Sequence, residues 1–162
     1  WAVGLDGSIA IARAGDYSVE WVRPDGSVVR GPANDYRPVR VGRDEKQAWV
    51  ERAARSGLRV EMTVENGRAS TSFGRGGRAS DDWERQYPEW PDVMPAFQPN
   101  GVFVTPGGEM WVERYVAADD PPAFDVFDSA GRMVRRISFS PGRRLAGFGR
   151  DAVYLVSAGA PR

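Results

Sequence analysis

The 162-residue chain contains no cysteine and no histidine. The absence of cysteine excludes disulfide bonds and thiolate metal sites, and it leaves the redox compartment open. The absence of histidine removes the commonest general base and metal ligand together. Serine chemistry is poorly supported as well, because the chain has neither a G-x-S-x-G turn nor a histidine to activate the serine.

An excess of one charge is also missing, because 22 basic and 22 acidic residues give a formal net charge of zero. No long-range field therefore favours nucleic acid or an anionic membrane. Lys46 is the only lysine, which we attribute to a genomic composition bias rather than to an arginine-based site. The chain also lacks an apolar run long enough to span a bilayer. We therefore expect neither nucleic acid nor a membrane span.

What the chain does contain is a repeated pattern of short apolar strands. Setting Val3, Val104 and Phe148 level places the start of the following strand at Ile9, Met110 and Tyr154. The second half of the unit returns too, because VEWVRPDG from Val19 matches FDVFDSAG from Phe124, and a final strand follows each. The step of roughly 44 residues from Val104 to Phe148 is typical of a four-stranded propeller blade.

The unit VFVTPGGEMWV, followed by FDVFDSAGRMVRRI, resembles a blade of the NHL-type and TolB-like propeller families. The resemblance implies an all-β fold, a β-propeller of four-stranded antiparallel blades, with about six blades in the ring and about two and a half of them present. It assigns residues 1–32 to one blade, 99–140 to a second and 141–162 to the start of a third. Because an open ring leaves unpaired edges, we expect this sequence to be a fragment and the remaining blades to belong to the same chain.

Residues 33–98 do not fit the repeat and form an insertion between the first two blades. We predict a helix over residues 45–55, with Asp44 as N-cap, Gln47 in the capping-box position and Gly57 at its end. A hairpin is predicted over residues 58–73 because Asn66-Gly67 is a strong turn signal. Residues 74–82 are expected to be mobile, and the aromatic and proline-rich stretch 83–97 to lie extended.

The resemblance also implies where a binding surface would lie. In propellers, the loops between the second and third strands share one rim of the channel with the connections between blades. The candidate rim residues are Asp16, Tyr17, Arg114, Tyr115, Asp119 and Asp120. The insertion would emerge on the same rim, and we expect it to pack over the channel mouth and to contribute to recognition.

Several smaller patterns have a functional and a structural interpretation. Asp119-Asp120 could ligate calcium, but we favour a solvated loop. The acidic run from Asp81 to Asp92 could bind a cation or a basic partner, but we favour a hydrated linker. Arg75–Arg78 could bind RNA, but a single copy in a neutral chain is a weak signal and we do not expect RNA binding. Arg13 and Arg114 could hold an anion, but we favour pairing with the equivalent acids Glu20 and Asp125. Trp21, Trp111 and Tyr154 are expected to pack between blades.

Two classes of function remain open. The first is a non-catalytic propeller scaffold that binds a protein, a peptide or a glycan through one rim, without a cofactor. The alternative is a calcium-dependent hydrolase similar to propeller lactonases, with catalytic residues on blades outside this sequence. Bacterial TolB-like propellers are often exported, so the resemblance favours an extracytoplasmic location.

Overall fold

The computed structural model describes residues 1–56, 58–65, 68–75 and 82–157. The chain divides into two compact units, and we treat each by itself. The first unit contains Trp1–Val39 and Val93–Arg162, and the second contains Arg40–Asp92. The second unit is therefore somewhat shorter than the predicted insertion, because the ends of that insertion belong to the first unit. Tyr36 and Phe97, for example, pack against the first unit's core.

Sheet I is the first four-stranded antiparallel sheet, and its strands follow one another in chain order. It consists of β1 (Ala2–Val3), β2 (Ile9–Arg13), β3 (Ser18–Val22) and β4 (Val28–Arg30). Gly7 and Gly26 close the turns at one end with φ angles of 81° and 83°, a region that glycine enters without steric cost. All four strands lie where the repeat predicts them.

Sheet II has the same order and consists of β7 (Phe97–Val104), β8 (Met110–Arg114), β9 (Ala123–Phe127) and β10 (Met133–Ser138). Its register matches that of sheet I, because Val104 pairs with Met110 as Val3 pairs with Ile9. β9 is buried along its whole length. A strand that is apolar on both faces belongs between two other layers.

Sheet III is the hairpin of β11 (Arg143–Phe148) and β12 (Val153–Ser157). Its turn is one residue shorter than predicted, because Phe148 pairs with Val153 and not with Tyr154. Within the described residues Tyr154 packs against no second sheet, and the prediction that it lies between sheets stays a prediction. The shift by one residue turns its side chain to the other face of the hairpin, where it is 59% exposed.

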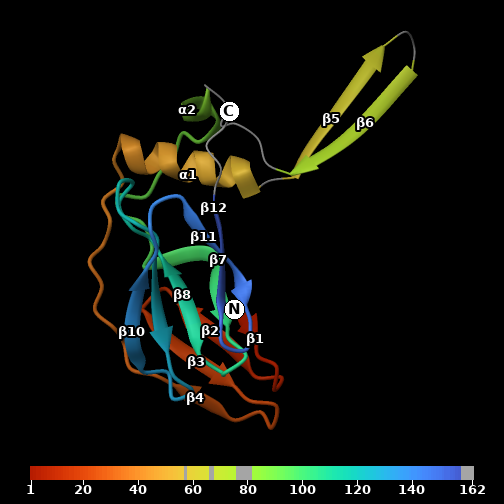
Figure 1. The fold of residues 1–162 in the computed structure, drawn as a ribbon. Helices are drawn as coiled ribbons and strands as arrows, with labels where there is room; N and C mark the ends of the chain where they lie inside the picture. The colour runs from red at the N-terminus through yellow and green to blue at the C-terminus, as the bar shows by residue number, and fades with distance from the viewer. Residues whose placement is uncertain (57, 66–67, 76–81, 158–162) are drawn as a thin grey trace. The chain divides into compact units, whose positions relative to one another are not determined.

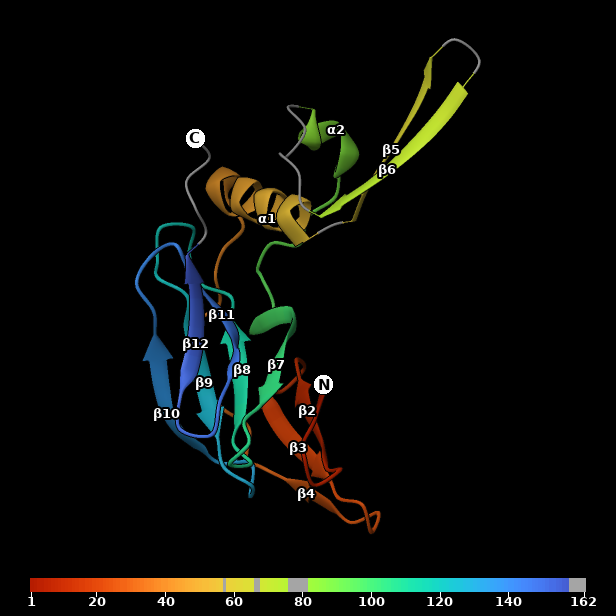
Figure 2. The same cartoon turned by 45° about the vertical axis from the view of Figure 1, so that its right-hand side comes forward.

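The three sheets of the first unit stack in series, with sheet II in the middle (Figure 1, Figure 2). One core cluster joins sheets I and II through Ala10, Val19 and Trp21 on one side and Met110, Val112 and Phe127 on the other. A second cluster joins sheets II and III through Trp111, Phe124 and Val126, against which Leu145 and Phe148 pack. The prediction that Trp21 and Trp111 lie between sheets is confirmed.

In the second unit, α1 (Arg43–Ser56) covers the predicted helix and begins two residues earlier. The predicted cap is wrong. Gly42 precedes the helix and is the N-cap residue. Its N–H donates to Oε2 of Glu45, three residues later, at 3.0 Å, which is the contact that a capping box makes. Asp44 instead lies in the first turn, where a negative charge still favours the helix dipole. None of the helices in the described residues is long and apolar enough to cross a membrane.

The predicted hairpin is present as β5 (Leu58–Glu65) and β6 (Arg68–Arg75), paired from Leu58↔Arg75 to Glu65↔Arg68. Asn66-Gly67 and Gly57 lie outside the described residues, as do residues 76–81 of the segment expected to be mobile. Gly74 and Arg75 of that segment belong to β6. We expected residues 83–97 to lie extended. They begin with a short helix, α2 (Trp83–Gln86), so the prediction is wrong for the first residues of that stretch.

Candidate functional site

The first candidate region is the loop end of sheets I and II, where β2 joins β3 and β8 joins β9. Tyr17 lies in the β2–β3 turn and is fully buried. Its φ of 43° is in the left-handed region, which is uncommon for a residue other than glycine. Its ring packs against Tyr36, Phe97 and Phe127. This conformation therefore directs the side chain into the space between the two sheets.

The Tyr17 hydroxyl donates a hydrogen bond to Asp125 of β9, which is itself fully buried. Two arginines neutralise this carboxylate. Arg136 Nε lies 2.6 Å from Asp125 Oδ1, and Arg114 Nη1 lies 3.5 Å from Asp125 Oδ2. A buried charge is tolerated when it is paired and hydrogen-bonded, and this one is both.

The same surroundings keep the tyrosine protonated. Burial raises the pKa of Tyr17 far above its usual range, and the hydrogen bond to Asp125 raises it further. The hydrogen bonds that Arg136 donates to Asp125 in turn raise the pKa of Arg136. Tyr17 is thus a fixed hydrogen-bond donor between sheets, and its chemistry is that of a structural contact.

The predicted rim residues divide into two groups. Tyr17, Arg114 and Tyr115 are buried, so they lie inside the fold and not on an open surface. Asp16, Asp119 and Asp120 are exposed. The Ser18 hydroxyl donates to Asp16, and this bond lowers the pKa of Asp16. A binding role for the three exposed acids stays a prediction, as does the role of the insertion.

Pairing of the two equivalent arginines with their acids is confirmed. Arg13 Nη1 lies 3.4 Å from Glu20 Oε2, and Arg114 contacts Asp125 as described above. Neither arginine is therefore left as an anion site. Within the described residues, no group of three or more acidic side chains is arranged to hold a metal ion.

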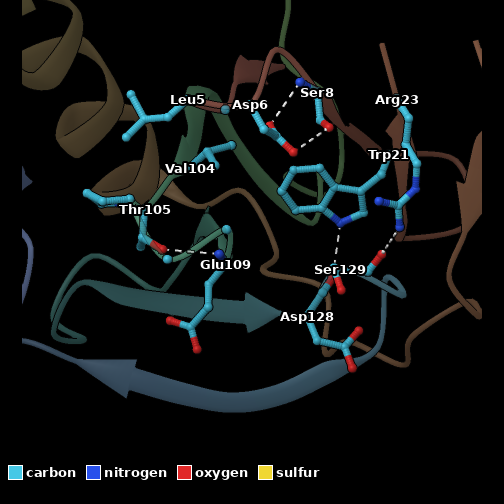
Figure 3. Close-up of a pocket in the computed structure, with 14 residues that line it drawn as sticks. Leu5, Asp6, Ser8, Trp21, Arg23, Val104, Thr105, Glu109, Asp128 and Ser129 are labelled. Atoms are coloured by element: carbon cyan, nitrogen blue, oxygen red, sulfur yellow. Dashed lines mark hydrogen bonds between the residues drawn. The ribbon is translucent and has the colours of Figure 1, made fainter. Parts of the chain in front are cut away.

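The second candidate region is a groove of about 660 Å³ at the opposite, turn end of sheets I and II (Figure 3). Its walls come from the β1–β2 turn, the β7–β8 turn and the starts of the β3–β4 and β9–β10 turns. The polar side chains that line it are Asp6, Ser8, Arg23, Thr105, Glu109, Asp128 and Ser129. Leu5 and Val104 add an apolar patch, and Leu5 is 88% exposed.

The carboxylates of this groove are all engaged, Asp6 and Asp128 within their own turns and Glu109 with an arginine of β10. Asp6 accepts hydrogen bonds from the N–H and hydroxyl of Ser8, and these bonds lower the pKa of Asp6. Asp128 accepts from the N–H groups of Arg132 and Ala130, and these bonds lower the pKa of Asp128, the contact with Arg132 being the larger cause. Glu109 Oε2 lies 2.7 Å from Arg135 Nη2.

Hydrogen bonds across the groove join the two sheets. Trp21 Nε1 donates to the carbonyl of Asp128 at 3.0 Å, and Arg23 Nη2 lies 3.5 Å from the carbonyl of Ser129 (Figure 3). With its acids engaged in hydrogen bonds and ion pairs, the groove offers hydroxyls, turn backbone and a small apolar patch. Such a surface can hold a ligand, but it presents no activated nucleophile beside a base.

Sequence reasoning missed this groove as a site. The turns that form it were visible as Asp6-Gly7 and Gly107-Gly108, but a turn signal predicts only a chain reversal. The groove exists because two turns from sheets about 100 residues apart in sequence come together when the sheets stack. No signal in either turn alone indicates that neighbour.

Comparisons of this chain with protein-family models, with curated proteins and with solved structures found no match.

Proposed function

We propose that the stacked sheets are blades of a β-propeller and that the protein is a non-catalytic scaffold, which binds a protein, a peptide or a glycan in the groove at the turn end. The support for blades is the shared strand order and register of sheets I and II. Further support is their stacking face to face with sheet III, which continues the series.

The observation that carries the binding proposal is the chemistry of the groove. Thr105 and Ser129 supply hydroxyls, while Leu5 and Val104 supply an apolar contact beside them. Peptides and sugars present alternating donors, acceptors and apolar faces, which fits such a mixed surface. Asp6 and Asp128 are already bonded within their turns and Glu109 to Arg135, which favours binding over acid–base catalysis.

A selection experiment with matched variants tests this proposal. The purified chain is used to select from a displayed peptide library and is applied to a glycan array. Each ligand obtained is then measured by calorimetry against Leu5→Ser with Arg23→Gln, and against Asp119→Asn with Asp120→Asn. All four positions are exposed, so these substitutions should leave the fold intact.

We expect the groove variant to weaken binding at least about tenfold, which corresponds to the loss of about 1.4 kcal/mol of contact. The variant at the loop end should bind like the unaltered chain. The opposite pattern would place recognition on the exposed acids Asp119 and Asp120, and the groove proposal would then be wrong. An absence of ligands from both collections would count against a peptide or glycan partner.

A further inference from the structure

Sheets I and II each carry a triad of one acid between two arginines, and the two triads occupy equivalent positions. In sheet I, Glu20 of β3 pairs with Arg13 of β2 and with Arg30 of β4, at 3.4 and 2.9 Å. In sheet II, Asp125 of β9 pairs with Arg114 of β8 and with Arg136 of β10. The strand register is the same, because Glu20 lies opposite Arg30 as Asp125 lies opposite Arg136.

We call the side of each sheet that carries the triad its triad face. The apolar residues on the two triad faces also correspond by register. The matched pairs are Val3 with Val104, Ile9 with Met110, Ile11 with Val112 and Val22 with Phe127. The two triad faces thus have the same layout of apolar and charged groups.

The triad face of sheet II is covered by sheet I. Ala10 and Val19 of sheet I pack into the core that contains Met110 and Val112, and the Tyr17 hydroxyl reaches Asp125. The triad face of sheet I has no such cover in the described residues. Val3 is 56% exposed, Ile9 37% and Val28 58%.

Two equivalent glycines, Gly131 of sheet II and Gly26 of sheet I, show the same difference between a covered and an uncovered face. Gly131 ends the β9–β10 turn of sheet II with φ 74°, and a Cβ placed on it would lie 2.6 Å from Gly31 N of sheet I. Gly26 is the equivalent residue of sheet I, with φ 83°, and nothing described lies within 4 Å of a Cβ placed there. The close backbone contact that Gly131 makes therefore has an equivalent position that is open.

We propose that the triad face of sheet I is a docking surface for a further four-stranded sheet of the same repeat, which supplies a tyrosine hydroxyl to Glu20. This inference rests on the proposed blade stacking and names the occupant of one blade face. The side of the partner sheet that faces sheet I must carry small residues. Sheet I uses Ala2, Ala10 and Ala12 in the same way on the side that faces sheet II. An anion is a poor occupant, because both arginines already pair with Glu20 and exposed apolar residues surround them.

The test is a chain in which a second copy of residues 1–101 is placed before Trp1. Gly101 then precedes Trp1 as it naturally precedes Val102, which is the equivalent residue of the repeat. The added copy brings its own sheet I and its own Tyr17 to the open triad face. A shorter version omits residues 40–92 from the added copy, because Met94 N–H donates to the Val39 carbonyl and the two ends therefore meet.

We measure melting temperatures in a double-mutant cycle between Tyr17→Phe in the added copy and Glu20→Gln in the original one. The calibrating cycle pairs Tyr17→Phe in the original copy with Asp125→Asn, a contact that is already established. We expect the longer chain to melt higher than the natural one. We expect both cycles to be non-additive, because each pair removes one shared hydrogen bond.

The proposal is overturned if the new pair is additive while the calibrating pair is not, or if neither extended chain folds. It is overturned as well if the natural chain forms a defined dimer by light scattering that Ile9→Asp dissolves, because the occupant would then be a second copy. None of these outcomes depends on ligand binding in the groove, so the two proposals fail separately.

Discussion

The two interfaces of the first unit are built by different means. Between sheets I and II, small side chains beside Tyr17 and Trp21 allow the backbones to approach, and Gly31 touches Gly131 directly. Between sheets II and III, aromatic rings fill the space, with Trp111 in ring contact with Phe124, Phe139 and Phe148. The first interface also contains the buried Asp125 and its hydrogen bond from Tyr17.

The two interfaces show that one repeat can stack in two ways. Where backbones approach closely, hydrogen bonds can cross the interface, and stability depends on the absence of a side chain at one or two positions. Where rings fill the gap, stability depends on their volume and on the apolar area removed from water. The first interface should therefore fail when atoms are added, and the second when atoms are removed.

Adding one methyl group at Gly31 gives the largest expected effect. A Cβ there would lie 1.9 Å from the Gly131 carbonyl oxygen, and the backbone of the partner sheet cannot move aside cheaply. We expect Gly31→Ala to lower the free energy of unfolding by more than about 5 kcal/mol, or to prevent folding. The matched control is Gly15→Ala, where nothing lies within 4 Å. Urea unfolding checks both, and equal stability of the two variants would refute the close-contact interpretation.

Removing the ring of Trp111 should have the next largest effect, and it acts on the other interface. Trp111 is 4% exposed and packs against three phenylalanine rings, so Trp111→Ala should cost about 4 kcal/mol through lost burial and a cavity. Tyr154→Ala removes an aromatic ring that is 59% exposed on β12 of sheet III and should cost much less. Similar losses in chemical unfolding would mean that sheet III does not depend on this core.

The strand pattern of sheets I and II could be predicted because two signals agree there. Glycine turns and apolar strands recur with the same spacing, and the Arg13–Glu20 and Arg114–Asp125 pairs follow from equivalent positions. Sheet III was predicted with a shift of one residue. Its turn, Gly149–Ala152, lacks the length of the other two, and a bulge at Leu145–Gly147 changes the register.

The candidate sites were harder to predict, because burial depends on the neighbouring sheet. Tyr17 stands between Asp16 and Ser18 in the sequence, yet it is fully buried and packs against Phe127 of sheet II. Nothing local indicates that Tyr17 takes a left-handed conformation and reaches a residue 108 positions away. The helix cap was predicted wrongly for a simpler reason. Asp44 could cap the helix itself, or Glu45 could bond back to Gly42, and the sequence does not choose between these two positions for the helix start.

The two triads provide a comparison of the same charges with and without cover. Asp125→Asn leaves Arg114 inside the interface without its anion, which should cost about 3 kcal/mol. Glu20→Gln changes the uncovered triad, where Arg13 and Arg30 remain about half exposed, and should cost less than about 1 kcal/mol. Thermal unfolding of the two single variants measures the loss of stability in each triad. Equal losses would show that cover by sheet I does not change the strength of the triad.

The smallest expected effect is a dependence on acid that belongs to sheets I and II. Asp6, Asp16 and Asp25 in sheet I and Asp128 in sheet II each have a pKa below the usual 3.8, because of hydrogen bonds that they accept from their own turns. A lowered pKa means that the unfolded chain binds more protons than the folded one near pH 4. These contacts therefore stabilise the fold above the unfolded pKa, and their contribution is lost as the pH falls through the folded pKa.

We expect the free energy of unfolding to fall as the pH is lowered from 5 towards 3, and to fall less steeply in Asp128→Asn, where one of the four titrating groups is removed. Asp119→Asn removes one carboxylate from the exposed β8–β9 loop and controls for the change in net charge. Urea unfolding at a series of pH values gives the slope for each chain. A slope in Asp128→Asn as steep as that of the natural chain would mean that the β9–β10 turn does not carry its share of the acid sensitivity. The fold would then owe that sensitivity to the turns that contain Asp6, Asp16 and Asp25.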